Sequence, residues 1–85
     1  MSGAISFDCE DLIYDVECDI KEFGKNKVVT VWQKKFYNQI FYVNYDFVEP
    51  KEVAPAEMRD GETLIKMTLG ELLECLQKQN SVLKE

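Results

Sequence analysis

Hydrophobic and polar residues alternate along the first part of the chain, from residue 12 to residue 22. One set of alternate positions is apolar (Leu12, Tyr14, Val16, Cys18 and Ile20), and the other is charged (Asp15, Glu17, Asp19 and Lys21). Successive side chains of a β-strand point to opposite faces, so this alternation predicts a half-buried strand over about 12–22. Residues 4–8 alternate in the same way and are the candidate for a further short strand.

The same stretch also has the spacing of an amphipathic helix. Its apolar residues recur every three or four positions, at Cys9, Leu12, Val16, Ile20 and Phe23. In that reading Asp8 caps the N-terminus of the helix and Gly24 ends it. The strand is favoured because the alternation misplaces no apolar residue between Tyr14 and Ile20, but strand and helix over residues 8–23 remain alternatives.

The middle of the chain predicts an antiparallel hairpin. Strands are expected over 27–36, which is rich in valine, and over 40–48, where aromatic and polar residues alternate. A three-residue loop at Tyr37–Gln39 joins them and places Val31 opposite Tyr45. The two segments are therefore the central strands of the expected sheet.

A turn signal at Gly24-Lys25 connects the first predicted strand to the second. A hairpin around this turn brings the apolar faces of the two strands together. It also places an acid of the first strand, Asp15 or Glu17, opposite Lys34. The charge pattern and the apolar pattern thus agree on the same pairing.

The rest of the chain predicts a loop, a short strand and a helix. Two prolines and an Asp-Gly pair mark 49–62 as a loop, and 63–67 is a short strand candidate. Thr68 and Glu71 have the spacing of a capping box, which starts a helix expected over about 69–82. The leucines at helical spacing are Leu69, Leu72, Leu73, Leu76 and Leu83.

These elements predict a single α+β domain over residues 1–85. An apolar helix stripe and an apolar sheet face must cover each other, so we expect a three- to five-stranded antiparallel meander sheet with one C-terminal helix packed on one face. The opposite sheet face is then expected to be exposed. It carries Asp15, Glu17, Asp19, Thr30, Trp32, Lys34, Tyr42, Asn44 and Asp46.

The composition predicts a folded domain without a catalytic motif. Of the 85 residues, 46% are hydrophobic, which is enough for a core without disulfides. The chain has no histidine and so lacks the commonest general base and metal ligand. Cys9, Cys18 and Cys75 are far apart, and we expect reduced thiols, with the last two packed as small apolar residues. We predict no catalytic residue, no metal and no cofactor.

The sequence contains no segment typical of a signal peptide or a membrane span. Its start lacks a basic region, and its longest apolar run, residues 40–43, is far shorter than the roughly 18 residues that a span requires. Together with reduced thiols, this predicts a cytoplasmic protein with no membrane partner. In size and acidity the chain resembles small proteins of bacterial mobile elements and phages, a resemblance that assigns no residue a role.

The charge of the chain limits its partners. Sixteen acids against ten bases give a net charge of −6, which makes duplex DNA an unfavourable ligand because DNA binding requires clustered Lys and Arg. In the strand reading, Asp15, Glu17 and Asp19 stand ~6.6 Å apart along one face. That spacing is too wide for neighbouring carboxylates to share one metal ion, so we interpret them as a solvated face.

A protein partner is the favoured interpretation of the expected exposed sheet face. Aromatic residues framed by charges are typical of interface centres. We therefore predict a small acidic, non-enzymatic interaction protein that binds an unknown protein partner, or a second copy of itself. The candidate residues are Asp15, Glu17, Asp19, Trp32, Lys34 and Tyr42.

Two alternatives use parts of the same surface. In the first, the acids make the protein an inhibitor of a nucleic-acid-binding enzyme, because a row of carboxylates fits a positively charged channel. In the second, Trp32 and Tyr42 stack unpaired bases while Lys34 contacts phosphate, which gives a weak single-stranded nucleic-acid binder. The only arginine, Arg59, lies outside that aromatic and basic stretch.

Overall fold

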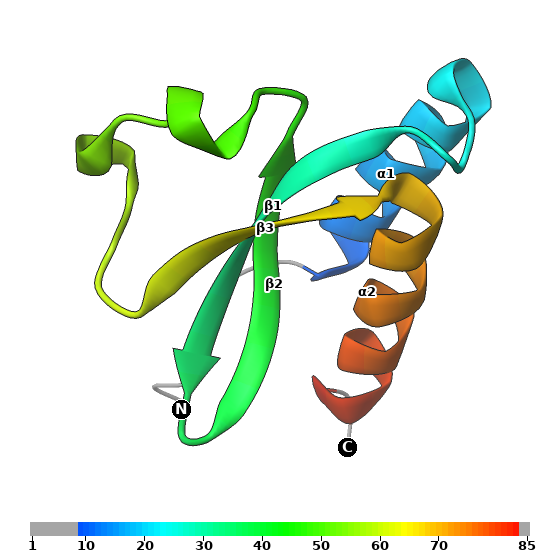
Figure 1. Ribbon diagram of the computed structural model, residues 1–85. Coiled ribbons are helices and arrows are strands. Elements are labelled where there is room, and N and C mark those ends of the chain that lie inside the picture. Colours follow the sequence, from blue (N-terminus) through cyan, green and yellow to red (C-terminus); the bar gives the residue numbers. More distant parts are fainter. Residues whose placement is uncertain (1–8, 84–85) are drawn as a thin grey trace.

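The computed structural model describes residues 9–83, which form two α-helices and three antiparallel β-strands in an open sheet (Figure 1). In chain order the elements are α1 (Cys9–Phe23), β1 (Val28–Phe36), β2 (Gln39–Asp46), β3 (Glu62–Thr68) and α2 (Leu69–Leu83), with two short 3₁₀ turns, η1 (Pro50–Glu52) and η2 (Pro55–Glu57), between β2 and β3. The predicted α+β class is confirmed. The candidate strand over 4–8 lies outside the described residues.

The strand predicted over 12–22 is wrong, because these residues belong to α1. Positions four apart, such as Leu12 and Val16, share a face in a strand and also in a helix, so they fit both patterns. The positions that distinguish the two are Tyr14 and Cys18, and both side chains are exposed. The helical alternative is the correct one.

The sequence around α1 explains why the helix forms. Acidic residues are depleted in strands and favoured near helix N-termini, which suits Glu10 and Asp11 in the first turn. Gly24 ends the helix with a φ of +89°, and its N–H donates to the Ile20 carbonyl over 2.8 Å. Because α1 takes the place of the predicted first strand, the expected pairing of Lys34 with Asp15 or Glu17 does not form.

The central strand of the sheet is β1, and the strand order is β2-β1-β3. The predicted meander is wrong, because β3 pairs with β1 and leaves β2, expected to be a central strand, at an edge. Val31 lies opposite Tyr45, as predicted. The β1–β2 turn has two residues rather than three, Tyr37 and Asn38, both with positive φ (51° and 67°), as tight hairpins require. Val43 is then the extra residue of a β-bulge, which restores the predicted register beyond it.

The main hydrophobic core joins both helices to β1. Its buried members are Cys9, Val16, Val29, Val31, Leu69, Leu72 and Leu76. The sheet face that carries Val29 and Val31 is called the helix face below, and Figure 1 shows the two helices side by side on that side of the molecule. Four of the five leucines predicted as a stripe on the C-terminal helix thus contribute to the core or pack against it, whereas Leu83 is exposed.

The bulge reverses the side-chain directions expected for the first half of β2. Tyr42 pairs with Gln33, lies on the helix face and packs partly against the core. Phe41 pairs with Lys34 on the opposite face, where it is buried. The predicted placement of Tyr42 on the same face as Trp32 is therefore wrong, because one extra residue exchanges the two faces of a strand.

The start of α2 has the predicted capping box. The Glu71 N–H donates to Thr68 Oγ1 over 3.1 Å, and the Thr68 N–H donates to the Glu71 carboxylate over 2.9 Å. A glycine at position 70, in the first turn of α2, is explained by the turn before β1, which approaches this position closely. The Gly70 N–H donates to the Lys25 carbonyl (2.9 Å), and a Cβ at this position would lie 3.2 Å from the Lys25 Cβ.

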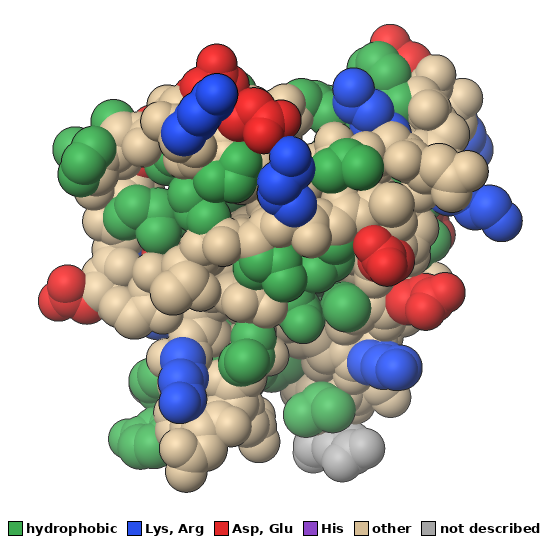
Figure 2. All heavy atoms as spheres, viewed as in Figure 1, with side chains coloured by type: hydrophobic (Ala, Val, Ile, Leu, Met, Phe, Trp, Pro, Cys, Tyr) green, Lys and Arg blue, Asp and Glu red, His purple; other side chains and the backbone are tan. Residues whose placement is uncertain are grey.

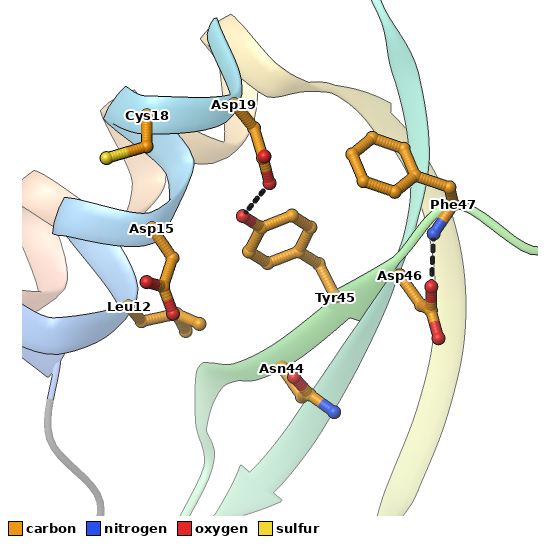
Figure 3. A pocket seen from close by; sticks show the side chains of 8 residues that line it. All are labelled: Leu12, Asp15, Cys18, Asp19, Asn44, Tyr45, Asp46 and Phe47. Atoms are coloured by element: carbon orange, nitrogen blue, oxygen red, sulfur yellow. Dashed lines mark hydrogen bonds between the residues drawn. The ribbon is translucent and has the colours of Figure 1, made fainter. Parts of the chain in front are cut away.

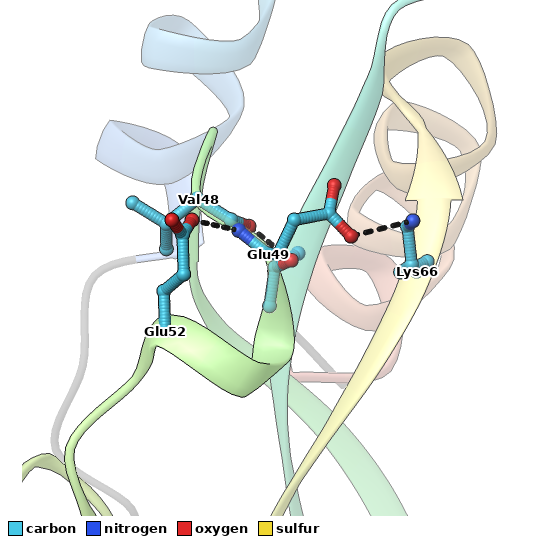
Figure 4. A network of polar contacts seen from close by, with 5 residues as sticks. Val48, Glu49, Glu52 and Lys66 are labelled. Atoms are coloured by element: carbon cyan, nitrogen blue, oxygen red, sulfur yellow. Dashed lines mark hydrogen bonds and ion pairs between the residues drawn. The ribbon is translucent and has the colours of Figure 1, made fainter.

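The sheet face opposite the helix face is partly covered by the segment that contains η1 and η2, and is called the loop face (Figure 1). The Thr30 hydroxyl donates to the Val48 carbonyl, and Lys66 Nζ forms an ion pair with Glu49 over 3.0 Å (Figure 4). Trp32 lies on this face and is only 7% exposed. The expectation of an exposed face centred on Trp32 is therefore wrong.

Candidate partner-binding groove

The six residues predicted to form one binding face occupy three different places. Asp15, Glu17 and Asp19 lie on α1, Trp32 and Lys34 lie on the loop face of β1, and Tyr42 lies on the helix face of β2. The buried Trp32 ring and the displaced Tyr42 ring offer no common stacking surface for bases. Of the three acids, Asp15 and Asp19 remain together on one side of α1.

A groove of about 340 Å³ lies between α1 and the second half of β2 (Figure 3). It is lined by Leu12, Asp15, Cys18, Asp19, Asn44, Tyr45, Asp46 and Phe47. Three of these side chains are carboxylates and none is basic. Because a helix and a strand supply most of the lining, the acids are held on rigid elements.

Two of the groove acids stand one helical turn apart. Asp15 and Asp19 lie on the side of α1 that faces β2 (Figure 3), and Asp19 accepts a hydrogen bond from the Tyr45 hydroxyl. Across the groove, the Asp46 carboxylate accepts the N–H of Phe47 over 2.7 Å. Within residues 9–83, no lysine or arginine forms an ion pair with any of these three acids. Their negative charge therefore remains available to a partner.

Tyr45 connects the two walls of the groove. Its ring packs partly against the core, and its hydroxyl reaches Asp19 on α1. Burial raises the pKa of Tyr45 far above the ordinary value for a phenol, and the hydrogen bond to Asp19 together with the nearby negative charges raises this pKa further. The hydroxyl consequently stays protonated and continues to donate across the whole neutral range.

Aromatic rings close one end of the groove. The Phe47 ring lies 5.0 Å from the Phe23 ring of α1 and 6.3 Å from the Tyr45 ring, measured between centroids. Lys27 Nζ lies 5.8 Å from the centroid of the Phe47 ring. Phe47 is nevertheless 41% exposed, so an apolar surface adjoins the carboxylates.

The surface of α1 extends the negative charge beyond the groove. The helix carries six acids, Glu10, Asp11, Asp15, Glu17, Asp19 and Glu22, against one lysine, Lys21. Asp15, Asp19 and Glu22 share one side of the helix because they are four and three residues apart. Glu17 is rotated from Asp15 by about 200° and lies on another side. The predicted acidic set is thus divided by the helical geometry.

The three thiols have different surroundings, and none of them forms a disulfide within residues 9–83. Cys9 is buried and its S–H donates to the Leu76 carbonyl over 3.5 Å, whereas Cys75 is half-buried. Cys18 is exposed, contrary to the expectation of a packed thiol, because residue 18 lies in a helix and not in a strand. Among the described residues, no group of three or more Cys, Asp or Glu side chains is arranged to hold a metal ion.

The sequence pattern did not identify the β2 side of the groove. It assigned Tyr45 and Phe47 to the core and Asn44 and Asp46 to an exposed sheet face, with no signal that a helix lies beside them. The i, i+4 spacing of acids on α1 is the signal that could have found the groove. That spacing carries meaning only once the helical reading is chosen.

Comparisons with known proteins leave the groove to be interpreted from its own chemistry. No protein-family model matches the chain, and comparisons with curated proteins and with solved structures give no significant match. Within residues 9–83, neither helix has the length and apolar character needed to cross a membrane.

Proposed function

We propose that this chain is a small, non-catalytic interaction protein of the cytoplasm that binds a basic segment of a protein partner in the groove between α1 and β2. The observation that carries the proposal is the position of two carboxylates without ion-pair partners, Asp15 and Asp19, beside the exposed ring of Phe47. A lysine or arginine side chain matches this surface, because its charged head pairs with carboxylates while its alkyl stem packs on an aromatic ring.

The charge distribution supports a basic partner over an anionic ligand. The net charge of the chain is −6, and the groove is lined by acids without a basic residue. Opposite charges accelerate association and make it sensitive to salt, whereas phosphate groups would be repelled by the same carboxylates. We therefore assign the groove to a protein segment rich in Lys and Arg.

Neutralising the groove acids tests this proposal. The variant Asp15→Asn/Asp19→Asn should bind a short Lys- and Arg-rich peptide about tenfold more weakly than the wild type, because two charge-assisted contacts are lost. Titration calorimetry at low and high salt measures the effect, and wild-type binding should itself weaken as salt screens the charges. The single variant Asp15→Asn leaves the Tyr45 hydrogen bond intact and separates lost charge from altered structure.

The matched control removes equal charge outside the groove. Glu17 lies on another side of α1 and Glu74 is exposed on α2, so Glu17→Gln/Glu74→Gln should retain most of the affinity. Equal losses in the two double variants would show that only net charge matters, and the groove proposal would then be rejected.

A second candidate is an acidic inhibitor of a nucleic-acid-binding enzyme. The observation that favours it is the row formed by Asp15, Asp19 and Glu22, because a helix holds these charges at a fixed spacing against a basic channel. The test begins with capture of the partner enzyme from host cells on the immobilised chain. Glu22→Gln should weaken binding to this enzyme, and a saturating oligonucleotide should displace the chain from the enzyme. Absence of displacement would reject the inhibitor while leaving the basic-segment proposal intact.

A further inference from the structure

The two edges of the sheet differ in how the rest of the chain covers them. At the β2 edge, the Tyr42 N–H donates to the side-chain oxygen of Gln79 (2.7 Å), and the Gln79 amide donates to the Tyr42 carbonyl (3.1 Å). A neighbouring strand would make the same pair of hydrogen bonds, so Gln79 closes this edge at Tyr42. The opposite edge of the sheet is β3.

The outward-facing backbone groups of β3 follow from its pairing with β1. At one end of the pairing the Leu69 N–H donates to the Lys27 carbonyl, and at the other end the Lys35 N–H donates to the Gly61 carbonyl. In an antiparallel ladder, residues that exchange hydrogen bonds alternate with residues whose N–H and C=O point the other way. The even-numbered residues of β3 therefore face outward. They are Glu62, Leu64, Lys66 and Thr68.

The middle of this edge is open. The N–H groups of Glu62 and Thr68 are used at the strand ends, the first by the Arg59 carbonyl and the second in the capping box. Within residues 9–83, no hydrogen bond reaches the outward N–H and C=O groups of Leu64 and Lys66 from another segment. In Figure 1 β3 passes in front of the other strands, and Figure 2 shows hydrophobic side chains gathered over the middle of the same surface.

The side chains of β3 are self-complementary about Leu64. When two copies of the strand pair antiparallel with Leu64 opposite Leu64, Glu62 of each copy lies directly across from Lys66 of the other. Two-fold symmetry produces this attractive pair twice. The outward backbone groups match in the same register, because the Lys66 N–H then faces the Glu62 carbonyl and the two Leu64 residues face each other.

We propose that β3 pairs with β3 of a second copy of this chain, which joins the two three-stranded sheets into one continuous antiparallel sheet. An open strand edge is a template for another strand, and a lysine on such an edge often serves only to repel one. In the symmetric pairing, Glu62 of one copy lies opposite Lys66 of the other. Lys66 therefore attracts the second strand instead of repelling it. The second copy is therefore the occupant that the charges of this edge select.

Charge reversal tests the register as well as the dimer. Lys66→Glu alone, or Glu62→Lys alone, places like charges opposite each other at both symmetric positions and should weaken dimerisation about tenfold in sedimentation equilibrium. The double variant Glu62→Lys/Lys66→Glu restores opposite charges and should recover association. Lys78→Glu on α2 is the matched control, because it makes the same charge change away from β3, and it should dimerise like the wild type.

Amide hydrogen exchange provides a measurement that needs no variant. The outward N–H groups of Leu64 and Lys66 should become more protected as protein concentration rises, whereas the inward N–H of Ile65 should be protected at every concentration. The single variants lose contacts of Lys66 with Glu49 or of Glu62 with the Arg59 N–H, so circular dichroism confirms that each is folded.

Several outcomes would overturn the proposed dimer. These are a monomer at concentrations up to about 1 mM, protection of Leu64 that does not change with concentration, and single charge reversals that dimerise as well as the wild type. A dimer whose charge-swapped double variant fails to recover would contradict this register. Binding of the basic peptide in the groove is measured separately, so failure of the dimer leaves the groove proposal standing.

Discussion

Tyr45 carries two separate interactions through one side chain. Its ring packs partly against the core on the helix face, while its hydroxyl crosses from β2 to the Asp19 carboxylate on α1. Hydrogen bonds to ionised acceptors are stronger than those between neutral groups, although partial exposure of this pair reduces the gain. Tyr45, which the sequence pattern assigned only to the core, therefore also holds the two walls of the groove, α1 and β2, together.

Removing the hydroxyl tests this role. Tyr45→Phe should lower the free energy of unfolding by about 1 kcal/mol at neutral pH, because the ring is retained and the hydrogen bond is lost. Urea unfolding monitored by circular dichroism measures the change. Tyr37→Phe is the control, because Tyr37 is 85% exposed and its loss of a hydroxyl should leave stability unchanged.

The pH dependence of stability gives an independent signature of the same bond. Folding raises the pKa of Tyr45, so its contribution is present in full below the unfolded pKa of about 10 and declines as the pH rises above that value. Between about pH 9 and about pH 11, the wild type should thus lose more stability than Tyr45→Phe. The pKa values of Tyr14 and Tyr42 are also raised, but both residues remain in the variant and cancel in the comparison. Parallel curves would contradict the assignment.

At the scale of elements, α2 serves both the core and the sheet edge. Its leucines fill the space beside β1, and one turn beyond Leu76 the buried Gln79 bonds to the β2 backbone. The helix therefore sets the position of the edge strand by polar contacts as well as by apolar packing. A polar residue in the line of a leucine stripe is explained by the backbone groups it satisfies.

Shortening this side chain should leave the β2 edge unsatisfied. Gln79→Ala should lower the free energy of unfolding by about 1–3 kcal/mol, because the Tyr42 N–H and C=O both lose their partner in a partly buried place. Gln77→Ala, on the exposed side of the same helix, is the matched control and should change stability little. Denaturant unfolding of the two variants side by side measures the difference, and equal midpoints would show that solvent replaces Gln79 without cost.

At the scale of the whole molecule, the fold distributes charge and backbone groups unequally. The acids of α1 gather beside β2, where the groove lies, while the open strand edge belongs to β3 on the other side of β1. The two proposed binding surfaces therefore use different strands. The net charge of −6 does not show this distribution. The charged residues of the groove are all acids, whereas the β3 edge carries an acid and a base.

Local signals in the sequence predicted those features that depend on near neighbours. The capping box of α2, its leucine stripe and the central hairpin with Val31 opposite Tyr45 were all predicted from spacing and turn residues. Two of the errors also have local causes. Positions four apart fit strand and helix alike in α1, and a two-residue turn plus a bulge reaches the same register as a three-residue turn.

The sequence by itself determined the α+β class, the start of the C-terminal helix and the acidity of the first segment, because each can be recognised from residues close together in the chain. The tertiary structure decided which face each side chain occupies and which acids meet a distant strand. It buried Trp32 on the loop face and placed Tyr42 on the helix face. It also brought Asp15 and Asp19 close to Tyr45. The physical reason is that a shift of one residue in strand register moves every side chain to the opposite face of the sheet. Which register forms depends on which side chains can be buried against elements that are distant in the sequence.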